Sequence, residues 1–203
     1  MKDKILHFLL IVLLVGLVLY LPISSIMELT NKKKIQDVTI VGACEAVSLE
    51  HSINYLIPVG IDYYYFGIDE KGDAYVIQAE KKWLEKNFNT DYTAKDSNGI
   101  KITGRVKKIH DYQVSNSIND SINKMGFEEN GINMPLTSEC VLDTLYIKSA
   151  IVKLVDFFIF VLAALGCLVM VKKKDKCPKV IGKATLCLIL AFCIISIKLL
   201  MQH

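Results

Sequence analysis

The sequence predicts an integral membrane protein with three transmembrane α-helices and a small α+β extracytoplasmic domain between the first and second helices. Three long apolar runs, at 5–27, 150–171 and 180–201, carry this prediction, because a helix needs about 20 apolar residues to cross a bilayer. The mixed segment between the first two runs, 30–148, has the length of one small domain. This distribution of apolar residues excludes a soluble enzyme, a fibrous protein and a disordered tail.

The first run, 5–27, is expected to remain in the membrane as an uncleaved signal-anchor. The alternative is a cleaved signal peptide, whose apolar core usually spans about 7–15 residues and ends in a small-x-small site. This run is longer, and the segment from Pro22 to Ile26 offers no such site. We therefore interpret it as the first transmembrane helix.

The other two runs form a predicted helical hairpin around a short basic turn, 172–179. Six lysines and one aspartate lie between 172 and 183, and short lysine-rich loops remain in the cytoplasm. With this turn inside, the N-terminus is also cytoplasmic, and both the domain 30–148 and the C-terminus lie outside. The excess of lysine over arginine, 23 to 1, fits an AT-rich genome. The layout resembles that of small envelope proteins of low-GC bacteria, which implies a bacterial plasma membrane.

The clearest local signal in the domain is a β-hairpin. Segments 63–68 and 74–78 are rich in strand-forming residues and flank a turn cluster that contains glycine. We therefore expect these two segments to pair with each other.

The rest of the domain alternates strand and helix signals. Apolar residues recur at helical spacing in 80–88 and 114–125, and strands are expected over 100–106 and 140–147. The region 37–57 is ambiguous, with a strand signal at its start and a possible helix after Ala43. This order of elements predicts an α+β layer fold.

Two cysteines, Cys44 and Cys140, lie in the expected outer domain. An oxidising compartment permits a disulfide between them, and the alternative is two separate buried thiols. The sequence has no Cys-x-x-Cys pair and no hydrolase, P-loop or zinc-protease motif. We therefore expect no catalytic residue, no metal ligand and no cofactor.

An aromatic cluster stands out by its density. Successive residues of a strand point to opposite faces, so one set of rings can belong to the core while the other forms an exposed surface for a partner. The alternative is that both faces are covered. The cluster comprises Tyr63, Tyr64, Tyr65, Phe66 and Tyr75.

Three charged residues interrupt the second and third apolar runs. Lys153 and Asp156 lie in the second run and Lys198 lies in the third, and charges inside a span normally face partners or water. Counted from the basic turn, Asp156 and Lys198 reach the same depth. We expect an interhelical Asp156–Lys198 contact, with Lys153 as a competing partner or reaching to the interface. Such a contact would fix the hairpin register or form an ion- or proton-sensitive site.

Together these features predict a membrane-anchored extracytoplasmic binding or interaction module, a non-catalytic accessory or envelope protein. Its partners would be the lipid bilayer and another membrane or envelope protein. Nucleic acid is not expected, because segment 28–149 carries 18 acidic against 14 basic residues. Two alternatives remain: a subunit of an oligomeric channel or transporter, and a membrane-bound enzyme with an active site in the outer domain.

Overall fold

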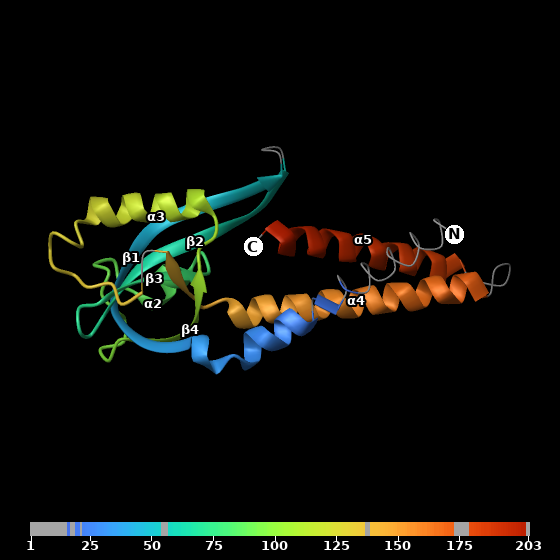
Figure 1. The fold of residues 1–203 in the computed structure, drawn as a ribbon, viewed down its shortest axis with the longest axis horizontal. Helices are drawn as coiled ribbons and strands as arrows, with labels where there is room; N and C mark the ends of the chain where they lie inside the picture. Colours follow the sequence, from blue (N-terminus) through green and yellow to red (C-terminus); the bar gives the residue numbers. More distant parts are fainter. Residues whose placement is uncertain are drawn as a thin grey trace, which may run out of the picture. The chain divides into compact units, whose positions relative to one another are not determined.

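The chain divides into two compact units (Figure 1). One unit is Asn31–Tyr146, and the other combines Met1–Thr30 with Ile147–His203. The computed structural model describes the backbone of residues 16, 19–20, 22–53, 57–136, 139–172 and 179–201. Within these ranges the side chains of 51–53, 57–59, 171–172, 179 and 197–201 are not described.

The unit Asn31–Tyr146 is built around a five-stranded barrel that closes in the order β1-β2-β3-β5-β4. Every neighbouring pair is antiparallel except β3 with β5. A barrel in which the first strand pairs with both the second and the fourth has the connectivity of the OB fold. The strands are β1 (Ile35–Ile53), β2 (Ile57–Asp69), β3 (Ala74–Ala79), β4 (Ile100–Lys108) and β5 (Cys140–Asp143), and a short 3-10 helix, η1 (Lys32–Lys34), precedes them.

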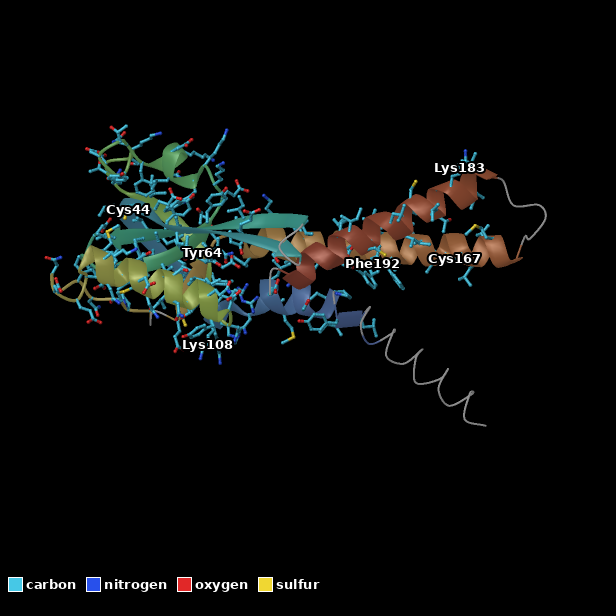
Figure 2. The ribbon with its side chains drawn as sticks, turned by 90° about the horizontal axis from the view of Figure 1, so that it is seen from above. Cys44, Tyr64, Lys108, Cys167, Lys183 and Phe192 are labelled. Atoms are coloured by element: carbon cyan, nitrogen blue, oxygen red, sulfur yellow. The ribbon has the colours of Figure 1, made fainter. Side chains whose placement is uncertain are left out.

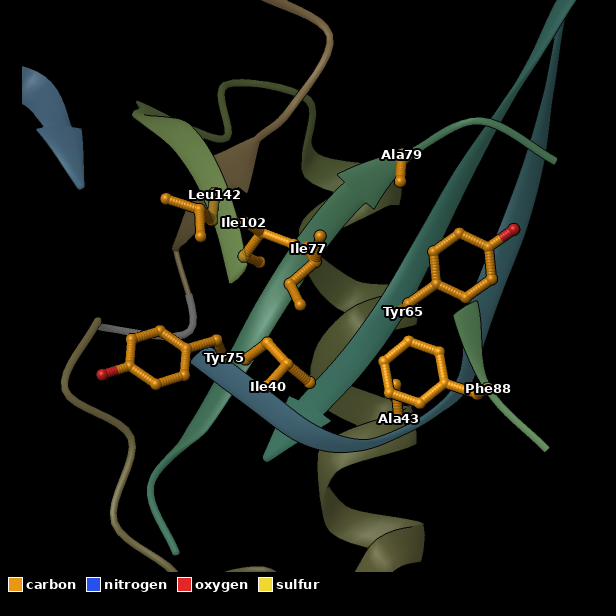
Figure 3. Close-up of a cluster of buried hydrophobic side chains, with 9 residues drawn as sticks. All are labelled: Ile40, Ala43, Tyr65, Tyr75, Ile77, Ala79, Phe88, Ile102 and Leu142. Carbon is orange, nitrogen blue, oxygen red and sulfur yellow. The ribbon is translucent and has the colours of Figure 1, made fainter. Parts of the chain in front are cut away.

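Alternation along the strands fills the barrel interior. On β3, Tyr75, Ile77 and Ala79 belong to the interior cluster, whereas Ala74 and Val76 belong to a second cluster on the outer face. All six residues of β3 are buried because both faces of this strand are covered. Figure 3 shows the interior cluster, which comprises Ile40, Ala43, Tyr65, Tyr75, Ile77, Ala79, Phe88, Ile102 and Leu142.

The helix α3 (Tyr112–Met125) covers the outer face of the barrel. Asp111 caps its N-terminus by accepting hydrogen bonds from the backbone N–H of Gln113 and Val114, which satisfies two of the free donors of the first turn. Gly126 ends it in the left-handed conformation, with φ 62°. Its buried residues, Val114, Ile118 and Ile122, are those whose spacing predicts the helix.

Two sequence-based expectations for this unit are wrong. The segment after Ala43 is not a helix, because β1 continues to Ile53. Register shifts between β1 and β2, such as the one between Glu45 and Val47, break the period-two alternation that would have marked a strand. The last strand also ends earlier than expected: Asp143 accepts a hydrogen bond from Leu145 N–H, and a helix begins at Tyr146.

The sheet also differs from the expected layer fold, because it closes on itself. The hairpin of β2 and β3 is as predicted, with Tyr63 opposite Ala79 and Ile68 opposite Ala74. The helix α2 (Trp83–Asn87) is a short form of the predicted helix 80–88. In the usual OB fold the principal helix follows the third strand, whereas here the long helix α3 follows β4.

The second unit is helical. Residues 22–30 are helical, and α4 (Tyr146–Lys172) and α5 (Lys179–Met201) follow the barrel. α4 and α5 pack antiparallel: the rings of Phe160 and Phe192 lie 5.1 Å apart, and a side chain on Gly166 would overlap Thr185. Figure 2 labels Phe192 on α5 and Cys167 on α4.

Gly104 provides a test of the barrel interior. A Cβ at this position would overlap Cγ of Leu142, which is fully buried. Gly104→Ala should therefore lower the free energy of unfolding by about 1–3 kcal/mol. The measurement is denaturant unfolding of the full chain in detergent, followed by the fluorescence of Trp83, the single tryptophan.

Gly60→Ala is the control, because a Cβ there meets no atom within 4 Å. Equal stability of the Gly104→Ala and Gly60→Ala variants would contradict the tight packing of Gly104 against Leu142.

Candidate functional site: polar contacts inside an apolar helical unit

The helical unit has apolar side chains on its surface and polar side chains inside. Large apolar residues such as Phe158, Leu162 and Ile194 are 55–68% exposed. Among the side chains that the structure describes in this unit, the buried polar ones are Ser25, Lys153, Asp156 and Thr185. Helices that pack in water show the opposite distribution. This polarity suits a lipid environment, in which charged side chains face the interior of a helix bundle.

Lys153 and Glu28 form the first polar contact. Lys153 Nζ lies 2.6 Å from Glu28 Oε1, and the two side chains are only 2% and 15% exposed. Glu28 belongs to the helical segment 22–30, and Lys153 lies in the second turn of α4. The ion pair therefore joins the first helix to α4.

Asp156 and Ser196 form the second polar contact. Ser196 Oγ donates a hydrogen bond of 2.6 Å to Asp156 Oδ2, which joins α4 to α5. The other carboxylate oxygen, Oδ1, is buried and has no hydrogen-bond partner among the described residues. Asp156 thus lies one helical turn beyond Lys153, and the two residues connect α4 to different helices.

These contacts differ in part from the pairing predicted from sequence. Lys153 pairs with Glu28, which sequence reasoning missed because the first span was expected to end at residue 27. Glu28 is an acidic residue that directly follows the C-terminal end of that run, and this position is the signal in the sequence that could have identified it. The side chain of Lys198 lies outside the described residues, so the Asp156–Lys198 contact stays a prediction. Ser196 precedes Lys198 by two residues, so Asp156 contacts α5 close to the position along that helix that the sequence predicted.

The disulfide considered for Cys44 and Cys140 is not formed. Both are free thiols. Cys44 lies on β1 and Cys140 begins β5, and these strands are not neighbours in the barrel. Cys44 packs against the cluster under α3, and burial raises the pKa of its thiol, which makes it a weak nucleophile at neutral pH.

The exposed aromatic surface is also absent, because both faces of the cluster are covered. Tyr64 and Phe66 are 6% and 1% exposed and lie in the cluster under α3. Tyr65 and Tyr75, 2% and 8% exposed, lie inside the barrel, and Tyr63 is half-buried against the same interior. The Tyr65 hydroxyl donates to the backbone oxygens of Glu80 and Lys81, at 3.1 and 2.9 Å.

The covered face is the one that OB folds commonly use for ligands. Oligonucleotides and oligosaccharides bind there across strands 2 and 3, but here the outer faces of β2 and β3 pack against α3. Ser121 of α3 also donates to the backbone oxygen of Ala46 on β1, at 3.2 Å. A ligand could reach this face only if α3 moved away.

The described residues also show no metal site. No group of three His, Cys, Asp or Glu side chains among them could hold a metal ion. His110 is exposed, and the His51 side chain lies outside the described ones. The candidate site of this chain is therefore the pair of polar contacts on α4.

Alkaline pH tests the burial of the tyrosines. Burial raises the pKa of Tyr65 to about 12 and also raises the pKa values of Tyr64 and Tyr75. Below about pH 10 the phenols are protonated in the folded and unfolded chain alike. Above it the unfolded chain loses its protons first, so the free energy of unfolding should fall as pH rises.

Tyr65→Phe should reduce this alkaline loss by at most about 1.4 kcal/mol at pH 11, since its pKa moves from about 10 to about 12 and only one pH unit of that shift is reached. The measurement is Trp83 fluorescence during unfolding between pH 8 and pH 11 (roughly the range in which phenols titrate). Tyr112→Phe is the control, because that ring is 77% exposed, and it should keep the full loss. The same loss in both variants would contradict a buried Tyr65 phenol.

A double-mutant cycle tests the ion pair. Lys153→Met or Glu28→Gln alone leaves a buried charge without its partner and should lower the free energy of unfolding by about 3–5 kcal/mol. The double variant should cost clearly less than the sum of the two. The measurement is the temperature at which the full chain in detergent loses half of its soluble fraction.

Lys183→Met, an exposed position on α5, should change this temperature little. Strict additivity of the two single changes would rule out the contact between Lys153 and Glu28.

No family model, no curated protein and no solved structure matches this chain.

Proposed function

We propose that this chain is a membrane-anchored protein whose barrel unit, Asn31–Tyr146, is an extracytoplasmic binding or interaction module of another membrane or envelope component. The observation that carries the proposal is the inverted polarity of the helical unit. Charged side chains are buried on α4, and large apolar side chains cover its outside. Water would penalise both features, whereas a bilayer favours them.

Length and composition support one span directly. Among the described residues, Tyr146–Met170 forms a helix of 25 residues that is long and apolar enough to cross a membrane. The apolar helical stretch Val180–Ser196 is shorter by the same measure. A core helix of a soluble protein could have this composition, but its large apolar side chains would be buried, and here Phe158 and Leu162 are exposed.

The orientation follows from the lysines. Eight lysines lie on the side of the N-terminus and of the basic turn 172–179, against four near the opposite ends of the three runs. The positive-inside rule therefore places the N-terminus and the basic turn in the cytoplasm. In this proposal the helices cross the plasma membrane of a bacterium, and the barrel unit and the C-terminus lie on its outer side.

A second function is favoured by Asp156. Its Oδ1 atom is buried without a hydrogen-bond partner among the described residues, and buried carboxylates of this kind occur in ion and proton pathways. Three helices enclose no pathway alone, so the chain would then be one subunit of an oligomeric channel or transporter. A cation or proton flux into vesicles that Asp156→Asn abolishes would favour this second function.

Thiol labelling of intact cells tests the anchored orientation. In a variant without the six native cysteines, Ser97→Cys should react with a membrane-impermeant thiol reagent, because Ser97 is exposed on the barrel unit. Lys174→Cys in the basic turn should react only after the cells are permeabilised.

Labelling of Lys174→Cys without labelling of Ser97→Cys would reverse the orientation. Release of the chain from membranes by an alkaline carbonate wash would reject the membrane anchor altogether.

A further inference from the structure

Two buried polar side chains lie next to each other on the outer face of the barrel. Tyr64 of β2 is directly opposite Gln78 of β3 in the ladder. Ile77 and Ala79 point into the barrel, so alternation along β3 directs Gln78 outward, and Tyr64 packs in the outer cluster. Tyr64 is 6% exposed and Gln78 is 8% exposed, so each side chain is more than nine-tenths buried.

The pair lies at the margin of the surface that α3 covers. The cluster under α3 includes Tyr64 and Val76 but not Gln78. Asp111, the N-terminal cap of α3, is one of the charges that act on the Tyr64 hydroxyl. The covered part of the outer face therefore ends at the N-terminal end of α3, and a ligand bound at this margin leaves α3 in place.

Neither side chain has a hydrogen-bond partner in the part of the chain that the structure describes. The buried hydroxyl of Tyr65, by contrast, donates to the backbone oxygens of Glu80 and Lys81. Buried polar groups are normally hydrogen-bonded, so two adjacent groups without a partner indicate a place for a ligand. Their polar atoms are not among the completely enclosed ones that lack a partner, so the Tyr64 hydroxyl and the Gln78 amide remain accessible from solvent.

Negative charge surrounds this pair. Burial raises the pKa of the Tyr64 phenol, and three carboxylates raise it further, those of Asp62, Asp143 and Asp111. Asp143 of β5 also lies directly opposite Gln78. Arg105 of β4 lies opposite Asp143 and balances the charge of one of the three. The surroundings of the Tyr64 hydroxyl therefore favour a cation over an anion.

The ligand that fits these groups is a compact cation with several N–H donors. Ionised carboxylates only accept hydrogen bonds, and the oxygens of a phenol and of an amide accept them as well. A primary ammonium group offers three donors on a small head. A metal ion fits less well, because no group of three His, Cys, Asp or Glu side chains in the described part of the chain could hold one.

We propose that Tyr64 and Gln78 form a binding site for the ammonium group of a primary amine. The Tyr64 oxygen and the Gln78 side-chain carbonyl accept hydrogen bonds from this group, and the carboxylate of Asp143 balances its charge. This inference rests on the proposed role of the barrel unit as a binding module, and all of its residues lie in that unit. It does not depend on the membrane anchor or on the orientation of the chain.

Methylammonium chloride is the probe, added at constant ionic strength to the full chain in a nonionic detergent. The glutamines of the chain are Gln36, Gln78, Gln113 and Gln202, so a protein labelled with the heavy nitrogen isotope only at glutamine gives few side-chain amide signals in nuclear magnetic resonance spectra. Gln78→Leu identifies the Gln78 signal by its loss. Methylammonium should move that signal until it saturates, whereas the signal of the exposed Gln36 should stay in place.

A matched salt and a matched variant control this titration. Tetramethylammonium chloride carries the same charge without an N–H donor and should leave the Gln78 signal in place. Tyr64→Phe removes only the hydroxyl and should weaken methylammonium binding by about tenfold or more, since a hydrogen bond to a charged group is lost. Tyr92→Phe should bind methylammonium as the native chain does, because that ring is 56% exposed and lies on the loop after α2.

A Gln78 signal that does not move in methylammonium would overturn the site. Equal shifts with tetramethylammonium, or an unchanged affinity in Tyr64→Phe, would overturn it as well. In the absence of amine, Tyr64→Phe should keep the unfolding temperature of the native chain. A clear drop would show that the hydroxyl has a structural partner, which also overturns the site.

The lysine derivative N-acetyl-lysine methylamide, titrated in the same way, separates two sources of the ammonium group. Tighter binding than that of methylammonium assigns the site to a lysine side chain of a protein, and weaker binding assigns it to a small free amine. Each result that overturns the site leaves the membrane anchor standing, because thiol labelling and the carbonate wash test the anchor separately.

Discussion

The barrel unit depends on one strand that pairs with two partners. β1 pairs with β4 over residues 35–40 and with β2 from there onward. To do so it must bend, and register shifts near Gly42 and Val47 supply the bend. The segment after α2 supports the crossing point: Ala43 N–H donates to Tyr92 O at 3.0 Å, and Ala94 N–H donates to Val41 O at 2.8 Å. The interior cluster and the position of α3 on the outer face both follow from this path of β1.

The helical unit depends on a different balance of forces. In the lipid environment that we propose for this unit, apolar side chains would gain nothing from packing against one another rather than against acyl chains, so close backbone approach and polar contacts would hold the helices together. Gly166 allows Thr185 of α5 to approach α4 closely. Ser196 joins α5 to Asp156, and Glu28 joins the first helix to Lys153. α4 is therefore the helix to which the other two are attached.

The sequence predicts the local elements better than their assembly. The spacing of Val114, Ile118 and Ile122 is that of an amphipathic helix, and the hairpin around the turn after Asp69 has strong strand formers on both sides. The path of β1 could not be predicted, because its bulges shift the alternation and make the segment after Ala43 resemble a helix. Closure of the sheet depends on pairs far apart in sequence, such as Ile35 with Arg105, which leave no local pattern.

The polar contacts on α4 were predictable only in part. Charges within apolar runs are rare, so Lys153 and Asp156 stand out in the sequence, and the antiparallel hairpin fixes their depth relative to α5. The choice of partner depends on rotation about each helix axis, which composition does not set. Ser196 is also an unremarkable residue in sequence, and only the arrangement of α5 against α4 gives it a role.

The position of β5 has a consequence for synthesis on the ribosome. This four-residue strand pairs with both β3 and β4, so until it is made the sheet is open and its two edges are unprotected. β5 is also the last strand before α4. The barrel can therefore close only when the chain has been made as far as the start of α4. In the membrane-anchored protein that we propose, barrel closure and membrane entry of α4 would follow each other closely during translation. A delay in making β5 would leave an unfinished sheet, whose unpaired strands can associate with those of another chain.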